Sequence, residues 1–115
     1  MGRKADMAMI ADLKKELERE AEEQNIPILR AAERKLLLDT AAEADPKRIL
    51  EVGTAVGYSA LLLAERFPLA EIDTIEIDAL RNERAISVMQ AAGFEQRVRC
   101  HWGDAGEVLP TLTGP

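Results

Sequence analysis

The sequence predicts an α/β protein with a half-sheet of three parallel strands in the spatial order 3-2-1, preceded by two helices. Two observations support this prediction. Residues 1–45 space their apolar side chains as amphipathic helices do, whereas residues 46–115 alternate short apolar runs with helix-forming segments. Parallel strands are joined by right-handed helical crossovers, which give consecutive strands the order 3-2-1. We therefore expect a helical region over residues 1–45 and a β-α-β-α-β unit over residues 46–115.

The first region is expected to contain two helices. Residues 5–24 are strong helix formers, and one face of this helix carries Ile10, Leu13, Leu17 and Ala21. The segment QNIPI ends this pattern, because a proline disfavours a helical residue before it. The second helix is predicted to run from residue 28 or 29 to Ala44, just before a second proline. Its buried face is predicted to consist of Leu29, Ala32, Leu36, Ala41 and Ala44, with Leu37 beside them.

Three strands are predicted in the second region, each followed by a helix. The strands cover residues 48–52, 71–78 and 97–102, and the helices cover residues 57–67, 79–93 and the segment from 103 onward. The first strand is almost entirely apolar, which is typical of a strand that is covered on both faces. Asp78 and Gly93 are expected to cap the amino and carboxyl ends of the middle helix.

The composition excludes several classes of protein. The chain of 115 residues is one domain at most, and its 15 basic and 21 acidic side chains give a net charge of −6. This charge argues against a broad nucleic-acid surface. No apolar run approaches the roughly 20 residues needed to cross a bilayer, and the single cysteine cannot form an internal disulfide. We expect a soluble, cytoplasmic protein without membrane contact.

A turn with two glycines joins the first strand to its helix. In residues 51–59, EVGTAVGYS, Gly53 allows a tight turn and a close approach of the backbone to a ligand. Gly57 is expected to let the helix start lie against the sheet. The free N–H groups at this helix start favour an anionic group, and Ser59 adds a hydroxyl there. Taken alone, the two glycines are also consistent with a purely structural turn.

The ends of the other two strands favour a ligand site. Ala55 stands at the second glycine position of the dinucleotide fingerprint, which argues against a nicotinamide cofactor. Glu76 lies near the end of the second strand, about 20 residues after the turn, where a carboxylate can accept hydrogen bonds from both ribose hydroxyls. Asp104 and Ala105 follow the third strand and can read an adenine edge. Together, the three strand ends indicate one nucleoside site.

The same segments resemble a known family. ILEVGTAVGYSALLLAERFP, IDTIEID, ISVMQAAGF and GDAGEVLPTL are together similar to the class I S-adenosylmethionine-dependent O-methyltransferases of the catechol and caffeoyl-CoA type. The bacterial members that methylate a hydroxyuridine in tRNA are the most similar, and NIPI fits their N-terminal helical region. The resemblance covers roughly residues 24–112. It implies a Rossmann-like fold and S-adenosyl-L-methionine as the cofactor.

The resemblance also implies a set of cofactor-binding residues: Glu51, Gly53, Thr54, Ala55, Tyr58, Ser59, Glu76, Asp104 and Ala105. The residues from 51 to 55 would surround the methionine part, and Tyr58 and Ser59 would hold its carboxylate. Glu76 would bind the ribose hydroxyls, and the last two residues of the set would border the adenine. Leu29 would approach the cofactor or the substrate.

Members of this family are roughly twice as long as this chain, and their second half carries the metal ligands, the catalytic neighbours and the substrate walls. The resemblance therefore implies the truncated N-terminal, cofactor-binding portion of an enzyme that methylates a hydroxyl group of a small molecule or of tRNA. We expect no catalytic residue and no metal ligand in this chain, and little or no activity from it alone. A divalent metal is expected only in the intact enzyme.

Three neighbouring residues of the last strand are expected to be structural. His101 is predicted to be a structural or edge residue, and Cys100 is predicted to be a core residue rather than a nucleophile. Trp102 is expected in the core, although its place at the strand end also puts it within reach of an adenine.

A homodimer is expected, because strand 48–52 would present an apolar edge with unpaired N–H and C=O groups. The apolar stripe of the helix over residues 5–24 is a second predicted interface. An alternative hypothesis for the whole chain is a ligand-free α/β association module whose main property is homodimerisation.

Overall fold

The computed structural model describes the backbone of residues 3–112 and the side chains of residues 7–112. Its elements are α1 (Arg3–Gln24), α2 (Ala31–Ala44), β1 (Arg48–Val52), α3 (Tyr58–Arg66), β2 (Glu71–Glu76), α4 (Ala79–Ala92), β3 (Val98–Trp102) and α5 (Ala105–Leu112). The three strands form one parallel sheet in the order β1-β2-β3. This order and the α/β class confirm the predicted fold. None of the helices described is long and apolar enough to cross a membrane.

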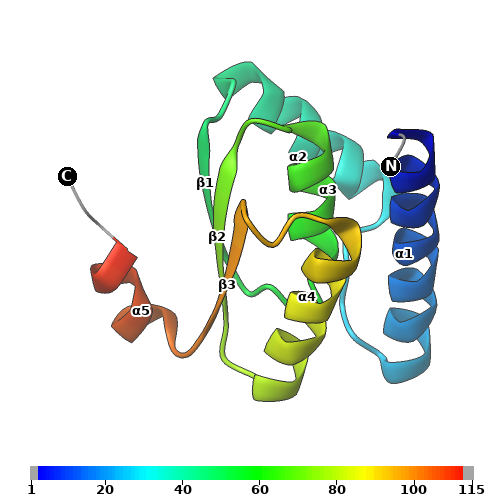
Figure 1. Cartoon of the computed structure of the whole chain (residues 1–115). Coiled ribbons are helices and arrows are strands. Elements are labelled where there is room, and N and C mark those ends of the chain that lie inside the picture. Colours follow the sequence, from blue (N-terminus) through cyan, green and yellow to red (C-terminus); the bar gives the residue numbers. More distant parts are fainter. Residues whose placement is uncertain (1–2, 113–115) are drawn as a thin grey trace.

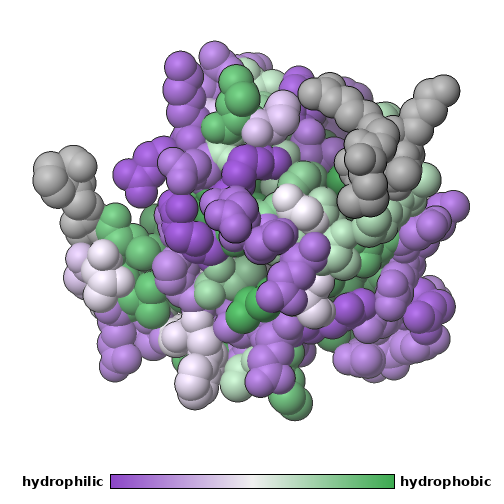
Figure 2. Space-filling model, in the orientation of Figure 1, coloured by the Kyte–Doolittle hydropathy of each residue, from purple (hydrophilic) through white to green (hydrophobic). Residues whose placement is uncertain are grey.

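The helices divide unequally between the two faces of the sheet (Figure 1). Helices α1 to α4 all lie on one side, with α1 outermost and packed against α3 and α4, whereas α5 alone lies on the other side. In the space-filling view, hydrophilic side chains cover most of the visible face, and apolar residues gather over α5 at the left (Figure 2). One face of the sheet is therefore covered by helices, and the other is largely open.

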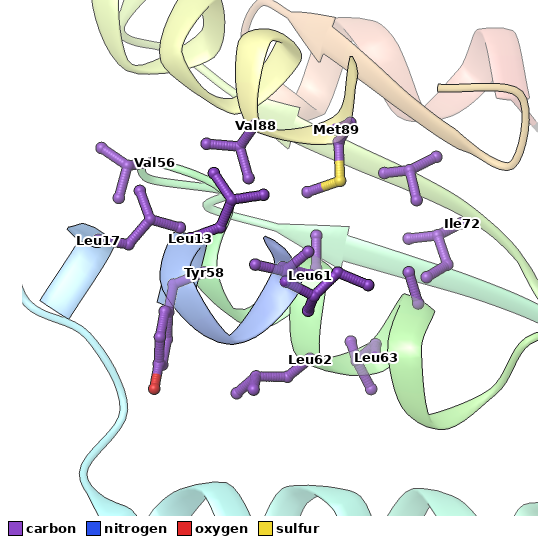
Figure 3. Close-up of a cluster of buried hydrophobic side chains, with 14 of the residues drawn as sticks. Leu13, Leu17, Val56, Tyr58, Leu61, Leu62, Leu63, Ile72, Val88 and Met89 are labelled. Atoms are coloured by element: carbon purple, nitrogen blue, oxygen red, sulfur yellow. The ribbon is translucent and has the colours of Figure 1, made fainter. Parts of the chain in front are cut away.

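The main core lies between the sheet and helices α1, α3 and α4 (Figure 3). Leu17 of α1, Leu61 of α3 and Ile72 of β2 are fully buried, and Val88 and Met89 of α4 pack beside them. The predicted stripe of α1 is buried along its whole length, from Ile10 to Ala21. Because other helices of the same chain cover this stripe, it offers no exposed apolar surface to a partner.

The predicted face of α2 is correct for Leu37 and Ala41 but wrong for Ala32, Leu36 and Ala44. The helix begins at Ala31, two or three residues later than predicted, after an extended segment that includes the half-buried Leu29. Leu36 is 67% exposed, and Ala32 and Ala44 are exposed as well. The residues of α2 that pack against the core are Leu37, Leu38, Ala41 and Ala42.

Strand β1 is covered on one face only, contrary to prediction. Ile49 and Glu51 are half-buried on the helical side, whereas Leu50 and Val52 are 52% and 58% exposed on the open side. The apolar character of this strand therefore reflects an uncovered face rather than two covered ones. Strand β2 ends at Glu76, two residues earlier than predicted, and Ile77 lies outside it with its side chain exposed.

Local signals placed the end of α1 and both ends of α4 correctly. Asn25, directly after α1, has a left-handed φ of 53°. The side chain of Asp78 accepts a hydrogen bond from the Arg81 amide at the start of α4, 2.9 Å away. Gly93 ends α4 with a φ of 78°, and its amide donates to the carbonyl of Gln90. These caps fix the length of the crossover helix between β2 and β3.

A charged cluster occupies the open face of the sheet around Asp73, which is 6% exposed. Arg99 donates to its carboxylate through Nε at 2.9 Å and Nη2 at 3.2 Å, and His101 Nε2 lies 2.8 Å from Oδ1. Arg48 is 3.9 Å away, and Arg99 also pairs with Glu71. The hydrogen bond from Arg99 is the main reason why the pKa of Asp73 lies below its ordinary value of 3.8, and burial opposes it.

This lowered pKa predicts a pH-dependent contribution to stability. A carboxyl whose pKa is lower in the folded state stabilises the fold above its unfolded pKa, and this stabilisation is lost as the pH falls through the folded value. We expect Asp73→Asn to lower the free energy of unfolding by about 1–2 kcal/mol at pH 6. The difference between the two proteins should shrink below about pH 3.8. Urea unfolding at pH 6 and pH 3 measures it, and an equal difference at both values would contradict this account.

Candidate functional site

The loops that follow the three strands meet at one edge of the sheet. The amides of Gly53 and Thr54 both donate to the carbonyl of Ile75, at 2.8 and 3.1 Å, which joins the turn after β1 to the end of β2. The amide of Gly103 donates to the carbonyl of Glu76 at 3.0 Å, which joins the end of β3 to the same point. The three predicted strand ends are therefore adjacent in space.

Glu76 lies at the centre of this edge. Its side chain is 6% exposed. Oε1 accepts a hydrogen bond from the amide of Ala55 at 2.7 Å, and Oε2 accepts one from the amide of Asp78 at 2.9 Å. A carboxylate has about four acceptor sites, so these two bonds orient the group and leave capacity for further donors.

A cavity of about 300 Å³ lies beside this edge, at the amino end of α3. The glycine turn forms one wall, and the extended segment before α2 forms the other. The residues that line it are Pro27, Ile28, Leu29, Glu33, Gly53, Thr54, Ala55, Tyr58 and Ser59. The cavity thus brings together most of the residues expected around the methionine part, whereas Glu51, Glu76, Asp104 and Ala105 lie outside its lining.

The two glycines of the turn have different roles. Gly53 has a φ of 84°, and a Cβ atom added to it would meet nothing within 4 Å among the residues described. Gly57 has a φ of 90°, and an added Cβ would lie 3.2 Å from both Cα and Cβ of Ala85 in α4. Gly57 therefore allows α3 to approach α4, not the sheet as expected. Ala55 between them also has a left-handed φ, of 51°.

Glu51 binds hydroxyl groups on both sides of the turn, one in α3 and one in β2. One carboxylate oxygen accepts a hydrogen bond from the hydroxyl of Ser59, and the other accepts one from Thr74 Oγ1 at 2.7 Å. The hydroxyls of Thr54 and Thr74 are hydrogen-bonded to each other. Burial raises the pKa of Glu51, and the two hydroxyl donors oppose this shift. The Ser59 proton is thus directed to Glu51, so its hydroxyl faces a ligand only as an acceptor.

The side chain of Tyr58 is held by the N-terminal helices. It is 2% exposed, and its hydroxyl donates to Glu18 of α1 at 2.5 Å. Arg34 of α2 donates to the same hydroxyl at 2.7 Å. Burial and the carboxylate of Glu18 raise the pKa of Tyr58 to about 12, so the phenol is neutral at physiological pH. Tyr58 therefore offers its backbone amide, rather than its hydroxyl, to a group at the start of α3.

Asp104 and Ala105 begin α5, next to the end of β2. Asp104 is exposed, and its carbonyl accepts hydrogen bonds from the amides of Glu107 and Val108 at 3.0 and 2.9 Å. The Gly103–Glu76 bond holds this segment on the side of Glu76 that faces away from the methionine cavity.

The neighbouring residues of β3 are structural, with one correction. His101 contacts Asp73 on the open face, and burial raises the pKa of the Cys100 thiol to about 11, which leaves it protonated at neutral pH. Trp102 is not in the core: it is 66% exposed, and its Nε1 donates to the carbonyl of Ile77 at 3.0 Å. In the part of the chain described, no group of three or more His, Cys, Asp or Glu side chains could hold a metal ion.

Sequence reasoning missed three residues that line the cavity: Pro27, Ile28 and Glu33. The first two precede α2 and form the wall opposite the glycine turn. Glu33 lies in the first turn of α2, where its Oε1 accepts a hydrogen bond from the amide of Arg30 at 2.8 Å. Its spacing from Arg30 is that of a capping interaction, but no local pattern indicates that α2 faces the turn after β1.

A family model for O-methyltransferases matches residues 4–114. The chain belongs to the O-methyltransferase family. It corresponds to the N-terminal portion of a class I S-adenosylmethionine-dependent O-methyltransferase, with the Rossmann-like fold of that class.

Individual relatives agree with the family match. The chain is 34% identical over 108 residues to a probable O-methyltransferase of Mycobacterium tuberculosis, covering 90% of this chain and 46% of that protein. The chain is also similar to the O-methyltransferase TomG of Streptomyces achromogenes, which is involved in tomaymycin synthesis and was solved in complex with S-adenosylmethionine. The two share 33% sequence identity with a TM-score of 0.75, and the match covers 93% of this chain and 48% of TomG.

A Staphylococcus aureus structure assigned as a caffeoyl-CoA O-methyltransferase has a TM-score of 0.80 at 28% identity. The match covers 86% of this chain and 47% of the Staphylococcus aureus chain. The chain thus spans about half the length of the relatives it matches.

Proposed function

We propose that this chain binds S-adenosylmethionine and is the cofactor-binding portion of an O-methyltransferase that transfers a methyl group to a hydroxyl acceptor. The observation that carries the proposal is the position of the Glu76 carboxylate. It is buried, oriented by two backbone amides, and adjacent through Ala55 to a cavity at the amino end of α3. Acidic residues in this position accept hydrogen bonds from ribose hydroxyls in open α/β sheets.

The described residues fit this cofactor. No side chain caps the amino end of α3, so its first N–H groups are available to the methionine carboxylate. Gly53 has open space beside it, which allows the close approach of a ligand. Asp104 and Ala105 would border the adenine on the far side of Glu76. When bound, S-adenosylmethionine supplies an electrophilic methyl group on its sulfonium centre.

The chain's own residues orient the cofactor and shape its site. Glu51 acts as a positioning residue, because it holds the hydroxyls of Ser59 and Thr74 and so fixes the start of α3. The Tyr58 hydroxyl, held between Glu18 and Arg34, fixes α3 against the two N-terminal helices.

The proposal extends to activity and acceptor. We expect these 115 residues alone to show little or no methyl transfer, since they span less than half of the Mycobacterium tuberculosis relative. The acceptor of the intact enzyme would be a hydroxyl group of a small molecule or of tRNA. The intact enzyme would also hold a divalent metal, and it would act in the cytoplasm. Methyl transfer by this chain to a catechol, at a rate typical of enzymes, would contradict this part of the proposal.

A crystal structure with S-adenosylhomocysteine soaked in tests the proposed site. The ligand should lie across the carboxyl edge of the sheet, with its ribose on Glu76 and its amino-acid part in the cavity beside Gly53. Density for the ligand elsewhere, with this edge empty, would contradict the proposal. A crystal in which a second copy covers the turn from Gly53 to Ser59 would instead favour the ligand-free association module.

A second property is proposed for the outer edge of β1. Among the residues that the structure describes, this strand pairs only with β2, and Leu50 and Val52 are exposed on its open face. A mostly apolar groove runs along its other face, where Leu37 and Ala41 of α2 and Leu63 of α3 approach the strand. An unpaired apolar edge of this kind is a template for strand addition. We propose that the chain forms a homodimer through β1.

Val52→Lys is expected to weaken this dimer at least tenfold, because the dimer would then have to bury a lysine on the apolar edge of each chain. Val52 is exposed, so the substitution should leave the fold unchanged. Sedimentation equilibrium at micromolar concentration measures the effect, with Leu69→Lys, at a residue that is 90% exposed, as the matched control. A monomeric wild-type chain under these conditions would contradict the dimer.

A further inference from the structure

The cavity at the start of α3 has two opposite electrostatic poles. Its inner wall is the uncapped amino end of α3, where free N–H groups and the helix dipole favour a negative group. Its outer wall carries Glu33, which is the only charged side chain among the residues that line the cavity. A lining with one positive and one negative pole is complementary to a zwitterion.

Glu33 is free to bind a cation. Its Oε1 accepts a hydrogen bond from the amide of Arg30, which fixes the carboxylate on the first turn of α2 and leaves the second oxygen available. None of the ion pairs formed by the described residues includes Glu33, although α2 carries other charged side chains: Arg34 is engaged by Glu18 and Tyr58, and Lys35 by Asp39.

The other two carboxylates near the turn are already engaged. Both oxygens of Glu51 accept hydroxyl hydrogen bonds from Ser59 and Thr74, and its side chain lies beneath the turn, outside the lining. Glu76 accepts from two backbone amides and lies beyond Ala55. An ammonium group in the cavity therefore finds its nearest uncommitted negative charge on Glu33.

We infer that Glu33 binds the α-ammonium group of the cofactor's methionine part, opposite the helix end that takes its carboxylate. This inference rests on the proposed function and adds a specificity-determining residue to it. Glu33 selects for the amino-acid part of the cofactor and contributes nothing to the nucleoside part. The contact between Glu33 and the ammonium group joins α2 to the cofactor, so cofactor binding also fixes the segment before α2.

Glu33→Gln tests the inference cleanly. Glutamine can replace glutamate in a capping interaction, so the hydrogen bond to the Arg30 amide is kept and only the charge is lost. Two ligands are titrated by calorimetry into the 115-residue chain: S-adenosylhomocysteine, which carries the ammonium group, and 5′-methylthioadenosine, which lacks the amino-acid part. Glu43→Gln, an exposed substitution on the same helix, matches the change in net charge.

We expect Glu33→Gln to weaken S-adenosylhomocysteine about fivefold, and 5′-methylthioadenosine less than twofold. The loss should become smaller at 1 M salt, because this pair is accessible to solvent. Equal affinity of the Glu33→Gln and Glu43→Gln variants for S-adenosylhomocysteine would overturn the inference and leave the proposed function standing. An equal loss for both ligands would also overturn it. Failure of the wild-type chain to bind either ligand would overturn the inference and the proposed function together.

Discussion

Glu76→Gln is expected to weaken the binding of S-adenosylhomocysteine by about 10- to 100-fold, because hydrogen bonds to a charged acceptor are worth about 1.5–3 kcal/mol. The carboxylate accepts from the amides of Ala55 and Asp78, and both of its oxygens are needed as acceptors. Glutamine presents one oxygen and one NH₂ group, so one amide and at least one ribose hydroxyl lose their acceptor. Calorimetric titration of the wild-type and variant chains measures this loss.

Asp78→Asn is the matched control for Glu76→Gln. It removes one negative charge two residues away from Glu76. Asparagine is as good an N-cap as aspartate, so the side chain at position 78 still accepts the hydrogen bond from the Arg81 amide at the start of α4. Its affinity for the ligand should change less than threefold. If Glu76→Gln and Asp78→Asn bind S-adenosylhomocysteine equally well, Glu76 is not the ribose acceptor.

Gly57→Ala is expected to lower the free energy of unfolding by about 2–5 kcal/mol. A left-handed backbone costs an L-residue about 1–2 kcal/mol, and Gly57 has a φ of 90°. An added Cβ would also lie 3.2 Å from the Cα of Ala85 and 3.3 Å from Met89 Cε, which forces α3 and α4 apart at a cost of about 1–3 kcal/mol. Urea unfolding of the two chains measures the difference.

Gly53→Ala separates the two costs. Gly53 has a similar φ of 84°, but an added Cβ meets no described atom within 4 Å, so only the backbone cost of about 1–2 kcal/mol remains. Because Gly53 lines the cavity, its replacement should weaken cofactor binding more than that of Gly57. Equal destabilisation by the two substitutions would contradict the packing role given to Gly57.

The order of the strands and the meeting of the three strand ends could be predicted from sequence, because their signals are local. Gly53, Asp78 and Gly93 each mark a turn or a cap that depends on a few neighbouring residues. The handedness of parallel crossovers then determines how the strands are arranged. Glu76 could be placed at the carboxyl edge for the same reason, since it ends a strand of that sheet.

The errors concern features that depend on distant parts of the chain. The face of α2 depends on how this helix packs against α3, which no pattern within α2 reveals. The coverage of β1 depends on which helices cross the sheet, and α5 is the one described helix on the open side of the sheet. Trp102 lies outside the core at the last position of β3, where its N–H donates to the carbonyl of Ile77. Glu33 enters the cavity only because α2 folds back over the turn that follows β1.

Calorimetric titration of the 115-residue chain with S-adenosylhomocysteine measures the proposed cofactor site most directly. We predict saturable binding of one ligand per chain that is lost or strongly weakened by Glu76→Gln and retained by Asp78→Asn. The absence of any binding heat at millimolar ligand, from a wild-type chain with intact secondary structure, would contradict a cofactor site formed by this chain.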